Sequence, residues 1–199
     1  MIWITHMNLT DLLKENERKY LINKTLSKGE ILFHENDVCK SLGIVTKGQL
    51  KITTFLENGK EVIYRDLMKD DVFGNNLLFS SEPLYKGDII AVNDASVFLI
   101  FHDDLLKILE ENLPFLTEYL KIQSDSTKKL NSRIKLLSFA NARERLIYYF
   151  HECKNSIEYE TISELADRLF LTRETLSRLI SKMEKENSII RTDKTIRLL

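Results

Sequence analysis

The sequence is poor in the residues that build disulfide-linked or metal-bound scaffolds. Its only cysteines, Cys39 and Cys153, lie far apart, so they supply neither a disulfide framework nor the four thiolates of an iron–sulfur cluster. The four histidines are scattered singly, without H-x-H or H-E-x-x-H spacing. We therefore expect a protein of the reducing cytoplasm with no metal site and no iron–sulfur cluster. Haem ligation by a single histidine, His34 or His102, is the one metal chemistry that composition leaves open.

Membrane-length apolar runs, a secretory leader and catalytic signatures are also missing. No apolar run approaches the roughly 20 residues of a membrane span. Residues 1–7 have neither the basic region nor the apolar core of a signal peptide, and Met7 is a second candidate start. The sequence has no glycine-rich phosphate loop and no G-x-S-x-G elbow. We expect a cytoplasmic protein without a membrane segment, and we do not expect an enzyme.

Glycine is confined to the first half of the chain. All six glycines lie before residue 90, among short apolar or β-branched runs. The clearest of these runs cover residues 31–33, 42–45, 49–55, 61–64 and 96–100. Many short strands separated by turns indicate a β-barrel, sandwich or roll. Ahead of them, residues 9–21 have the apolar spacing of a short amphipathic helix.

Charge divides the chain in a similar way. Residues 1–119 carry 13 Lys and Arg against 19 Asp and Glu, whereas residues 120–199 carry 16 against 11. Neutralisation of phosphates by basic side chains drives binding to nucleic acid, so the asymmetry favours a C-terminal part that meets a polyanion. Because the basic excess is small, we expect tight binding to need two copies of that part.

A long helical pattern joins the two halves, from about residue 103 to 139, with a break near Pro114. Beyond the proline, seven residues follow at alternating spacings of four and three, which is the seam of a coiled coil: Leu116, Leu120, Gln123, Thr127, Leu130, Ile134 and Leu137. The seam predicts a homodimer. The alternative is that the stripe packs against the chain's own β-domain. The two polar members could fix the register or contact a ligand held beside the helix.

Residues 161–180 predict two short helices that meet at a tight turn. Thr161 with Glu164 has the spacing of a capping box, and Thr172 can cap the second helix. Phe170 stands where glycine commonly supplies positive φ, at a cost of about 1 kcal/mol if the turn keeps that conformation. Residues 189–198 then predict a β-hairpin, the wing of a winged helix. This pattern favours DNA binding over an ordinary helical hairpin with a solvated charged face.

The order of these parts resembles the CRP/FNR family of bacterial transcription regulators. Residues 28–37 resemble the family's opening K-G-E-x-L-F-x-E-G-D, with Asn36 in place of glycine, and Asp70 replaces a second glycine. Asn and Asp are the next-best residues for positive φ, so both replacements are mild. The resemblance implies an α+β fold with an N-terminal double-stranded β-helix of the jelly-roll, cyclic-nucleotide-binding type. It also implies a long dimerisation helix and a C-terminal winged helix-turn-helix, with domains at residues 1–108, 109–138 and 139–199.

The second helix of the pair carries the family's R-E-T-x-x-R pattern in a form that is similar to the FNR branch. We predict base contacts from Arg173, Glu174, Ser177 and Arg178. Arg178 can donate two bonds to guanine O6 and N7, Glu174 can accept from cytosine N4, and Ser177 can touch thymine. The expected site is a pseudo-palindrome with TGA in each half, of the TTGAT kind. We expect phosphate contacts at Thr161, Thr172, Thr175, Lys182, Arg191 and Lys194.

The effector is less defined. In cyclic-AMP-binding members, the resemblance requires a glutamate just after the Phe-Gly pair and an arginine followed by serine or threonine. Here residues 73–77 read F-G-N-N-L and residues 85–87 read Y-K-G, so both charges are missing. We expect no cyclic-AMP control, predict no cofactor, and leave the effector unknown. A different small molecule could be held by Asn75, Asn76, Tyr85, Lys86, Gln123 and Thr127, or the protein could act without a ligand.

Two other classes of protein fit parts of the sequence. A jelly roll is also the fold of metal-dependent cupin enzymes, but those usually bring clustered histidines. A ligand-sensing subunit that acts on a protein partner without touching DNA would show no salt-dependent binding to a duplex. For a regulator that does bind double-stranded DNA, RNA polymerase is a further possible partner. The sequence does not determine whether such a regulator activates or represses transcription.

Overall fold

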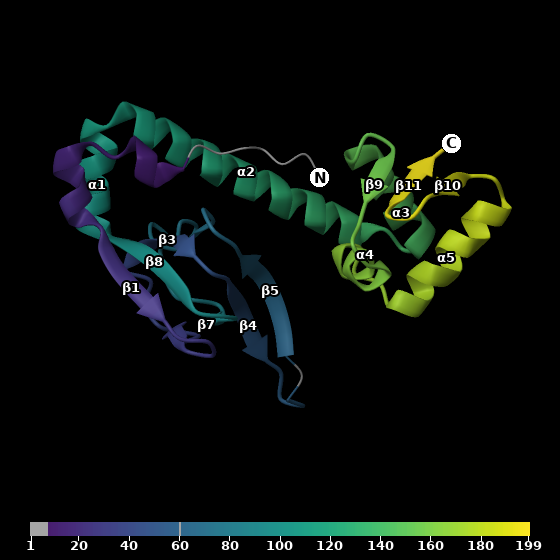
Figure 1. Ribbon diagram of the computed structural model, residues 1–199, viewed down its shortest axis with the longest axis horizontal. Helices are drawn as coiled ribbons and strands as arrows, with labels where there is room; N and C mark the ends of the chain where they lie inside the picture. Colours follow the sequence, from purple (N-terminus) through teal and green to yellow (C-terminus); the bar gives the residue numbers. More distant parts are fainter. Residues whose placement is uncertain (1–7, 60) are drawn as a thin grey trace. The chain divides into compact units, whose positions relative to one another are not determined.

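The computed structural model describes residues 8–59 and 61–199 (Figure 1). The chain forms two compact units, residues 6–123 and residues 124–199, and the boundary between them falls inside helix α2 (Leu113–Ser138). Each unit has its own hydrophobic core. No helix among the described residues combines the length and apolar character needed to cross a membrane.

The first unit is a β-roll made of two four-stranded antiparallel sheets. One sheet has the order β1 (Ile22–Leu26), β8 (Ala95–Phe101), β3 (Ser41–Lys47), β6 (Val72–Phe73). The other has the order β2 (Ile31–Phe33), β7 (Asp88–Ala91), β4 (Leu50–Phe55), β5 (Glu61–Leu67). The chain passes repeatedly from one sheet to the other, as in a double-stranded β-helix. Fully buried Leu42, Leu50 and Ile89 show how strands of both sheets supply the core between them. The predicted fold class is confirmed.

Two turns of the β-roll use the residues that replace glycine. Asn36 has φ 69° and Asp70 has φ 71°, both in the left-handed region. Each backbone N–H is satisfied by a carbonyl across the roll: Asn36 N donates to Tyr85 O at 2.8 Å and Asp70 N donates to Val45 O at 2.8 Å. Both turns therefore keep the left-handed conformation for which Asn and Asp are the next-best residues after glycine.

The N-terminal segment differs from its prediction. Instead of one amphipathic helix over residues 9–21, it forms two short 3-10 helices, η1 (Leu9–Leu12) and η2 (Glu15–Tyr20). Extended backbone at Leu13 and Lys14, with ψ 130° and 158°, separates them. The buried Glu17 carboxylate accepts from Lys14 N at 2.7 Å and from Asn112 Nδ2 at 2.7 Å. The prediction of a single helix was wrong. The buried Glu17 carboxylate caps a second helix that begins after Lys14, and it also bonds Asn112, which is distant in the sequence.

Helix α1 (His102–Glu111) and α2 are separated at Asn112, as the proline predicts. Asn112 has φ −125° and ψ 86°, and its Oδ1 accepts from Phe115 N at 3.1 Å. The side chain therefore caps α2, while Pro114 occupies the first turn, where its missing N–H costs nothing.

The second unit is a winged helix. After the C-terminal part of α2 come α3 (Ala142–Glu152), β9 (Ser156–Glu158), α4 (Ile162–Arg168), α5 (Arg173–Lys185), β10 (Ile189–Arg191) and β11 (Thr195–Leu198). The three strands form one antiparallel sheet of order β10-β11-β9. The predicted hairpin is confirmed in β10 and β11. Strand β9 was not predicted, because three residues are too few to establish a period.

Candidate nucleic-acid interface and sensor site

Helices α4 and α5 close on one core through the faces that their spacing predicts. Leu165, Leu169, Leu176 and Ile180 have no exposed surface, and Ala166 is buried where the helices approach. Leu171, between the helices, and Leu179 are partly buried against the same cluster. Since one side of α5 is committed to this core, the opposite side is left to face solvent.

Both helices start at the predicted threonines. Thr161 Oγ1 accepts from Glu164 N at 3.1 Å, and Thr172 Oγ1 accepts from Thr175 N at 3.2 Å. The reciprocal bond of the capping box differs from the prediction, because Glu164 Oε2 accepts from Glu160 N at 3.0 Å rather than from Thr161. The Thr161 hydroxyl is used as an acceptor in its capping bond, so its proton can still be donated to a phosphate oxygen.

The turn between the helices is strained at one residue. Phe170 has φ 53°, and its side chain is 45% exposed, so packing contributes little to holding the conformation. The next residue continues the turn, as Leu171 N donates to Ala166 O at 2.9 Å. The turn thus keeps the positive φ that glycine commonly supplies, which is the condition attached to the expected cost of about 1 kcal/mol.

The four predicted base-contacting side chains lie together on the exposed side of α5. Arg173, Glu174, Ser177 and Arg178 are all exposed. Within the part of the chain that the structure describes, no hydrogen bond or ion pair engages any of these four side chains. Their donors and acceptors are therefore available to the edges of bases, with no internal bond to break first.

The predicted phosphate contacts are in different situations. The Thr172 and Thr175 hydroxyls bond each other at 2.9 Å, and Lys182 Nζ lies 4.0 Å from Glu186 Oε1. Arg191 Nε donates to Tyr159 OH at 3.0 Å. These bonds engage only part of each group's hydrogen-bonding capacity, so the remaining donors can reach a phosphate.

Lys194, on the wing, is already paired with a carboxylate. Its Nζ lies 2.5 Å from Glu160 Oε2, and this hydrogen bond raises the pKa of the Lys194 ammonium. A phosphate would have to compete with Glu160 for this cation. Glu160 was not predicted, because it lies 34 residues before Lys194 in the chain and meets it only through the pairing of β9 with β11.

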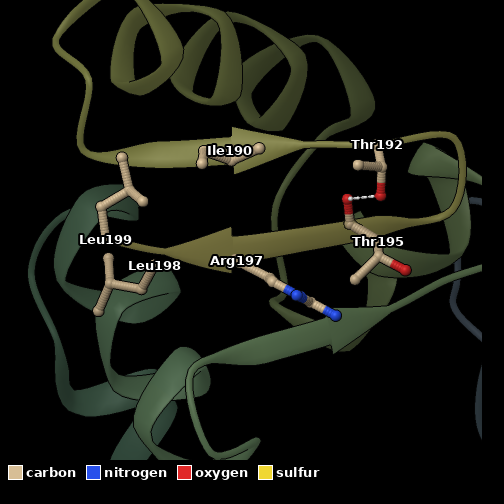
Figure 2. A pocket seen from close by; sticks show the side chains of 6 residues that line it. All are labelled: Ile190, Thr192, Thr195, Arg197, Leu198 and Leu199. Carbon is tan, nitrogen blue, oxygen red and sulfur yellow. Dashed lines mark hydrogen bonds between the residues drawn. The ribbon is translucent and has the colours of Figure 1, made fainter.

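A depression of about 400 Å³ lies on the β10–β11 hairpin (Figure 2). Its lining comprises Ile190, Thr192, Thr195, Arg197, Leu198 and Leu199. Thr192 Oγ1 donates to Thr195 O at 3.3 Å and closes the tip of the hairpin. Arg197 is the only charged side chain in this lining, and it is exposed.

The predicted seam on α2 is mostly exposed. Leu130 and Ile134 are each 57% exposed and Leu137 is 49% exposed, while Leu120 and Thr127 are also exposed and Leu116 is half-buried. The adjacent Leu136 is instead the side chain of this segment that enters the core of the winged helix.

The side chain of Gln123, in the middle of the seam, forms hydrogen bonds with the β-roll. Asn75 Nδ2 donates to Gln123 Oε1 at 2.6 Å, and Gln123 Nε2 donates to Asn75 O at 2.5 Å. Tyr119 completes the group, since its OH donates to Asn75 O at 3.3 Å and accepts from Gln123 Nε2 at 3.1 Å. Two of the predicted effector residues are thus brought together, but they bond each other. Tyr119 was missed, although it lies one helical turn before Gln123.

The other predicted effector residues are dispersed. Tyr85 is buried and stacks on Phe33 with ring centroids 4.8 Å apart, and burial raises its pKa above the ordinary value for tyrosine. Asn76 and Lys86 are exposed, and Thr127 belongs to the second unit. Burial likewise raises the pKa of the nearby Cys39 thiol, which keeps it protonated. Among the described residues, no three or more His, Cys, Asp or Glu side chains gather as metal ligands.

Comparisons with known proteins agree with this architecture. The family model "Cyclic nucleotide-binding domain" matches residues 23–112. The "Anaerobic regulatory protein" of Bacillus subtilis (strain 168) is 25% identical over 177 residues, which are 83% of this chain and 74% of the relative. The "Fumarate and nitrate reduction regulatory protein" of Escherichia coli (strain K12) is 26% identical over 203 residues, 94% of this chain and 80% of the relative.

Solved structures have the same fold over nearly the whole chain. The catabolite activator protein of Thermus thermophilus aligns with a TM-score of 0.57 at 21% identity and covers 97% of this chain and 94% of its own. A CooA mutant from Carboxydothermus hydrogenoformans aligns with a TM-score of 0.69 at 22% identity, covering 98% and 92%. A β-roll followed by a winged helix with an exposed recognition helix defines a two-domain DNA-binding regulator. This chain is a DNA-binding transcription regulator of the CRP/FNR type.

Proposed function

We propose that this regulator binds a pseudo-palindromic DNA site as a homodimer, through α5 of each copy, under control of a signal received by the β-roll. The observation that carries the proposal is the exposed side of α5, where four polar side chains have no internal partner among the described residues. The relatives named as anaerobic and fumarate and nitrate reduction regulatory proteins support transcription regulation. We place the protein in the cytoplasm, where its DNA would lie.

In this proposal, Arg178 donates to guanine, Glu174 accepts from cytosine, Ser177 contacts thymine, and Arg173 serves a base or a phosphate at the start of the helix. The half-site is of the TTGAT kind. Phosphate contacts from Thr161, Thr172, Thr175, Lys182, Arg191 and Lys194 set the register of the helix in the major groove but carry no sequence information.

The homodimer forms through the exposed seam of α2, with Leu130, Ile134 and Leu137 as its apolar members. Two copies are needed because one winged helix offers only a small basic excess, and two recognition helices read half-sites centred about one helical turn apart. The domains at residues 1–108, 109–138 and 139–199 act as sensor, dimer helix and output. RNA polymerase is the partner that we expect a bound dimer to contact at a promoter.

For the input, we propose that a signal at the β-roll acts where Asn75, Tyr119 and Gln123 bond each other. This group ties the β-roll to the helix that carries the seam, so a ligand that breaks or stabilises it shifts the equilibrium between two arrangements of that helix. The residues around it, with Asn76, Tyr85, Lys86 and Thr127, are the candidates for contact with such a ligand.

The proposal is tested by selecting duplexes from a random pool with the purified protein and measuring affinity for the selected duplex across salt. We expect a symmetric motif with TGA and TCA halves and a steep loss of affinity as salt rises. Arg178→Ala should abolish the preference for the selected duplex while sparing binding to a scrambled one. Lys185→Ala, at the other end of α5, is the matched control. A protein that shifts no duplex at low salt would be a sensor acting on a protein partner instead.

A further inference from the structure

One arginine of the winged helix binds two carbonyl groups from segments that are far apart in the chain. Arg145 lies in the first turn of α3 and is half-buried. Its Nε donates to Phe139 O at 3.2 Å, and its Nη1 donates to Phe170 O at 3.1 Å. The guanidinium is planar and rigid, so the two bonds fix the position of one carbonyl relative to the other.

The carbonyl at Phe170 belongs to the strained turn that precedes the recognition helix. Phe170 holds φ 53° although its exposed ring gains little from packing. Thr172, two residues later, is the residue that starts α5. The orientation of the Phe170 carbonyl therefore helps to set the direction in which α5 leaves the turn. A bond from a charged donor is the strong kind of hydrogen bond that can hold such a turn.

The carbonyl at Phe139 belongs to the segment between the end of α2 and the start of α3. The Phe139 ring packs on Tyr148 with centroids 5.2 Å apart, and Lys135 Nζ lies 4.9 Å from the centre of the same Tyr148 ring. This segment is thus held both by its ring and by its carbonyl. Arg145 therefore links the segment after the end of α2 to the turn that sets the direction of α5.

We propose that Arg145 is a positioning residue for DNA recognition, which holds the turn before α5 in register with the end of the dimer helix. The proposal rests on the proposed reading of DNA by α5. Because Nε and Nη1 both bond carbonyls inside the protein, we assign Arg145 a role through geometry, which the comparison of selected and scrambled duplexes separates from neutralisation of a phosphate. A lysine cannot replace it, since a single ammonium does not reproduce the fork that spans the two carbonyls.

Arg143 provides a matched control on the same helix. It is half-buried like Arg145, and its Nη1 bonds Glu186 Oε2 at 2.6 Å. Removing it takes away the same charge from the same turn of α3 but leaves the two carbonyls held.

The test compares the affinity of the full chain for the selected duplex and for a scrambled duplex, by fluorescence anisotropy. Arg145→Lys, which keeps at most one of the two bonds, should weaken binding to the selected duplex about tenfold, and Arg145→Ala, which removes both, should weaken it at least as much. Each should change binding to the scrambled duplex less than about twofold. Arg143→Ala should leave the ratio of the two affinities unchanged.

A second substitution separates positioning from a general loss of structure. Glycine adopts positive φ without support, so adding Phe170→Gly to Arg145→Lys should restore most of the affinity for the selected duplex. The proposal would be overturned if Arg145→Lys bound the selected duplex as tightly as the parent protein, or if the variants lost equal affinity for the selected and the scrambled duplex. If Arg145→Ala does not fold, the lysine variant decides alone. If the parent protein prefers no duplex, the proposed function fails instead.

Discussion

Gln123 on α2 binds Asn75 of the β-roll twice, through Asn75 Nδ2 to Gln123 Oε1 at 2.6 Å and Gln123 Nε2 to Asn75 O at 2.5 Å. Asn75 immediately follows the Phe-Gly pair, where the cyclic-AMP-binding members that the chain resembles carry a glutamate. Asn75 is only 4% exposed, so its polar groups depend on this helix for partners. The side chain and the main-chain carbonyl of Asn75 are therefore both bonded by Gln123 of α2.

Replacement of Gln123 by alanine should destabilise the protein. The change leaves the buried Asn75 amide without an acceptor, and an unsatisfied buried polar group costs about 1–3 kcal/mol. Urea denaturation should show a free energy of unfolding lower by this amount. Lys128→Ala, an exposed change on the same helix, should leave it unaltered. An unchanged midpoint for Gln123→Ala would mean that water replaces the lost bonds.

Cyclic AMP should not alter DNA affinity. The position after Gly74 is a neutral asparagine already engaged by Gln123, and residues 85–87 carry no arginine for the cyclic phosphate. Anisotropy titrations of the selected duplex, with and without saturating cyclic AMP, should therefore overlap. Tighter binding in its presence would show that other residues of the β-roll hold the nucleotide.

Charged substitutions on the exposed seam should split the dimer. Leu130→Glu or Ile134→Glu places like charges from two copies against each other in what should be an apolar contact. Sedimentation should then report a monomer, and affinity for the selected duplex should fall at least ~10-fold, because one recognition helix has to bind alone. Asn131→Glu adds the same charge beside the seam as a control. A monomer that binds as tightly as the parent would contradict the role of α2.

Removal of the Glu160 carboxylate should strengthen DNA binding. Glu160→Gln releases Lys194 from its ion pair, so the ammonium no longer has to leave a partner before it meets a phosphate. We expect affinity for selected and scrambled duplexes to rise together by about two- to fivefold, the size of an exposed pair. Glu110→Gln removes the same charge from the β-roll unit and should have no effect. Weaker binding by Glu160→Gln would mean that the pair positions the wing instead.

Local patterns predicted much of this molecule because their physical causes are local. Leu165 and Leu169 share one helical face, and Leu176 and Ile180 share another, through the 3.6-residue period alone. The caps at Thr161 and Thr172 need only the next three residues. Phe170 stands at the turn position where glycine is commonly used, and the structure has positive φ there, so the condition attached to its cost is met.

Contacts between segments that are distant in the sequence could not be predicted from local patterns. The N-terminal segment forms two 3-10 helices because the buried Glu17 binds Asn112, a residue 95 positions away. The pairing of Lys194 with Glu160, 34 residues apart, and the bond from Arg145 to Phe170 O, 25 residues apart, have the same character. Side-chain periodicity carries no information about which distant polar groups meet.

By itself, the sequence determined the order of the parts, the ends of α4 and α5, and the side of α5 that stays exposed, because hydrophobic spacing and capping act within a few residues. Only the tertiary structure decided how the polar groups are paired: Gln123 with Asn75, Lys194 with Glu160, and Arg145 with two carbonyls. Hydrogen bonds need groups about 3 Å apart in a defined direction, and that geometry exists only after the chain has folded.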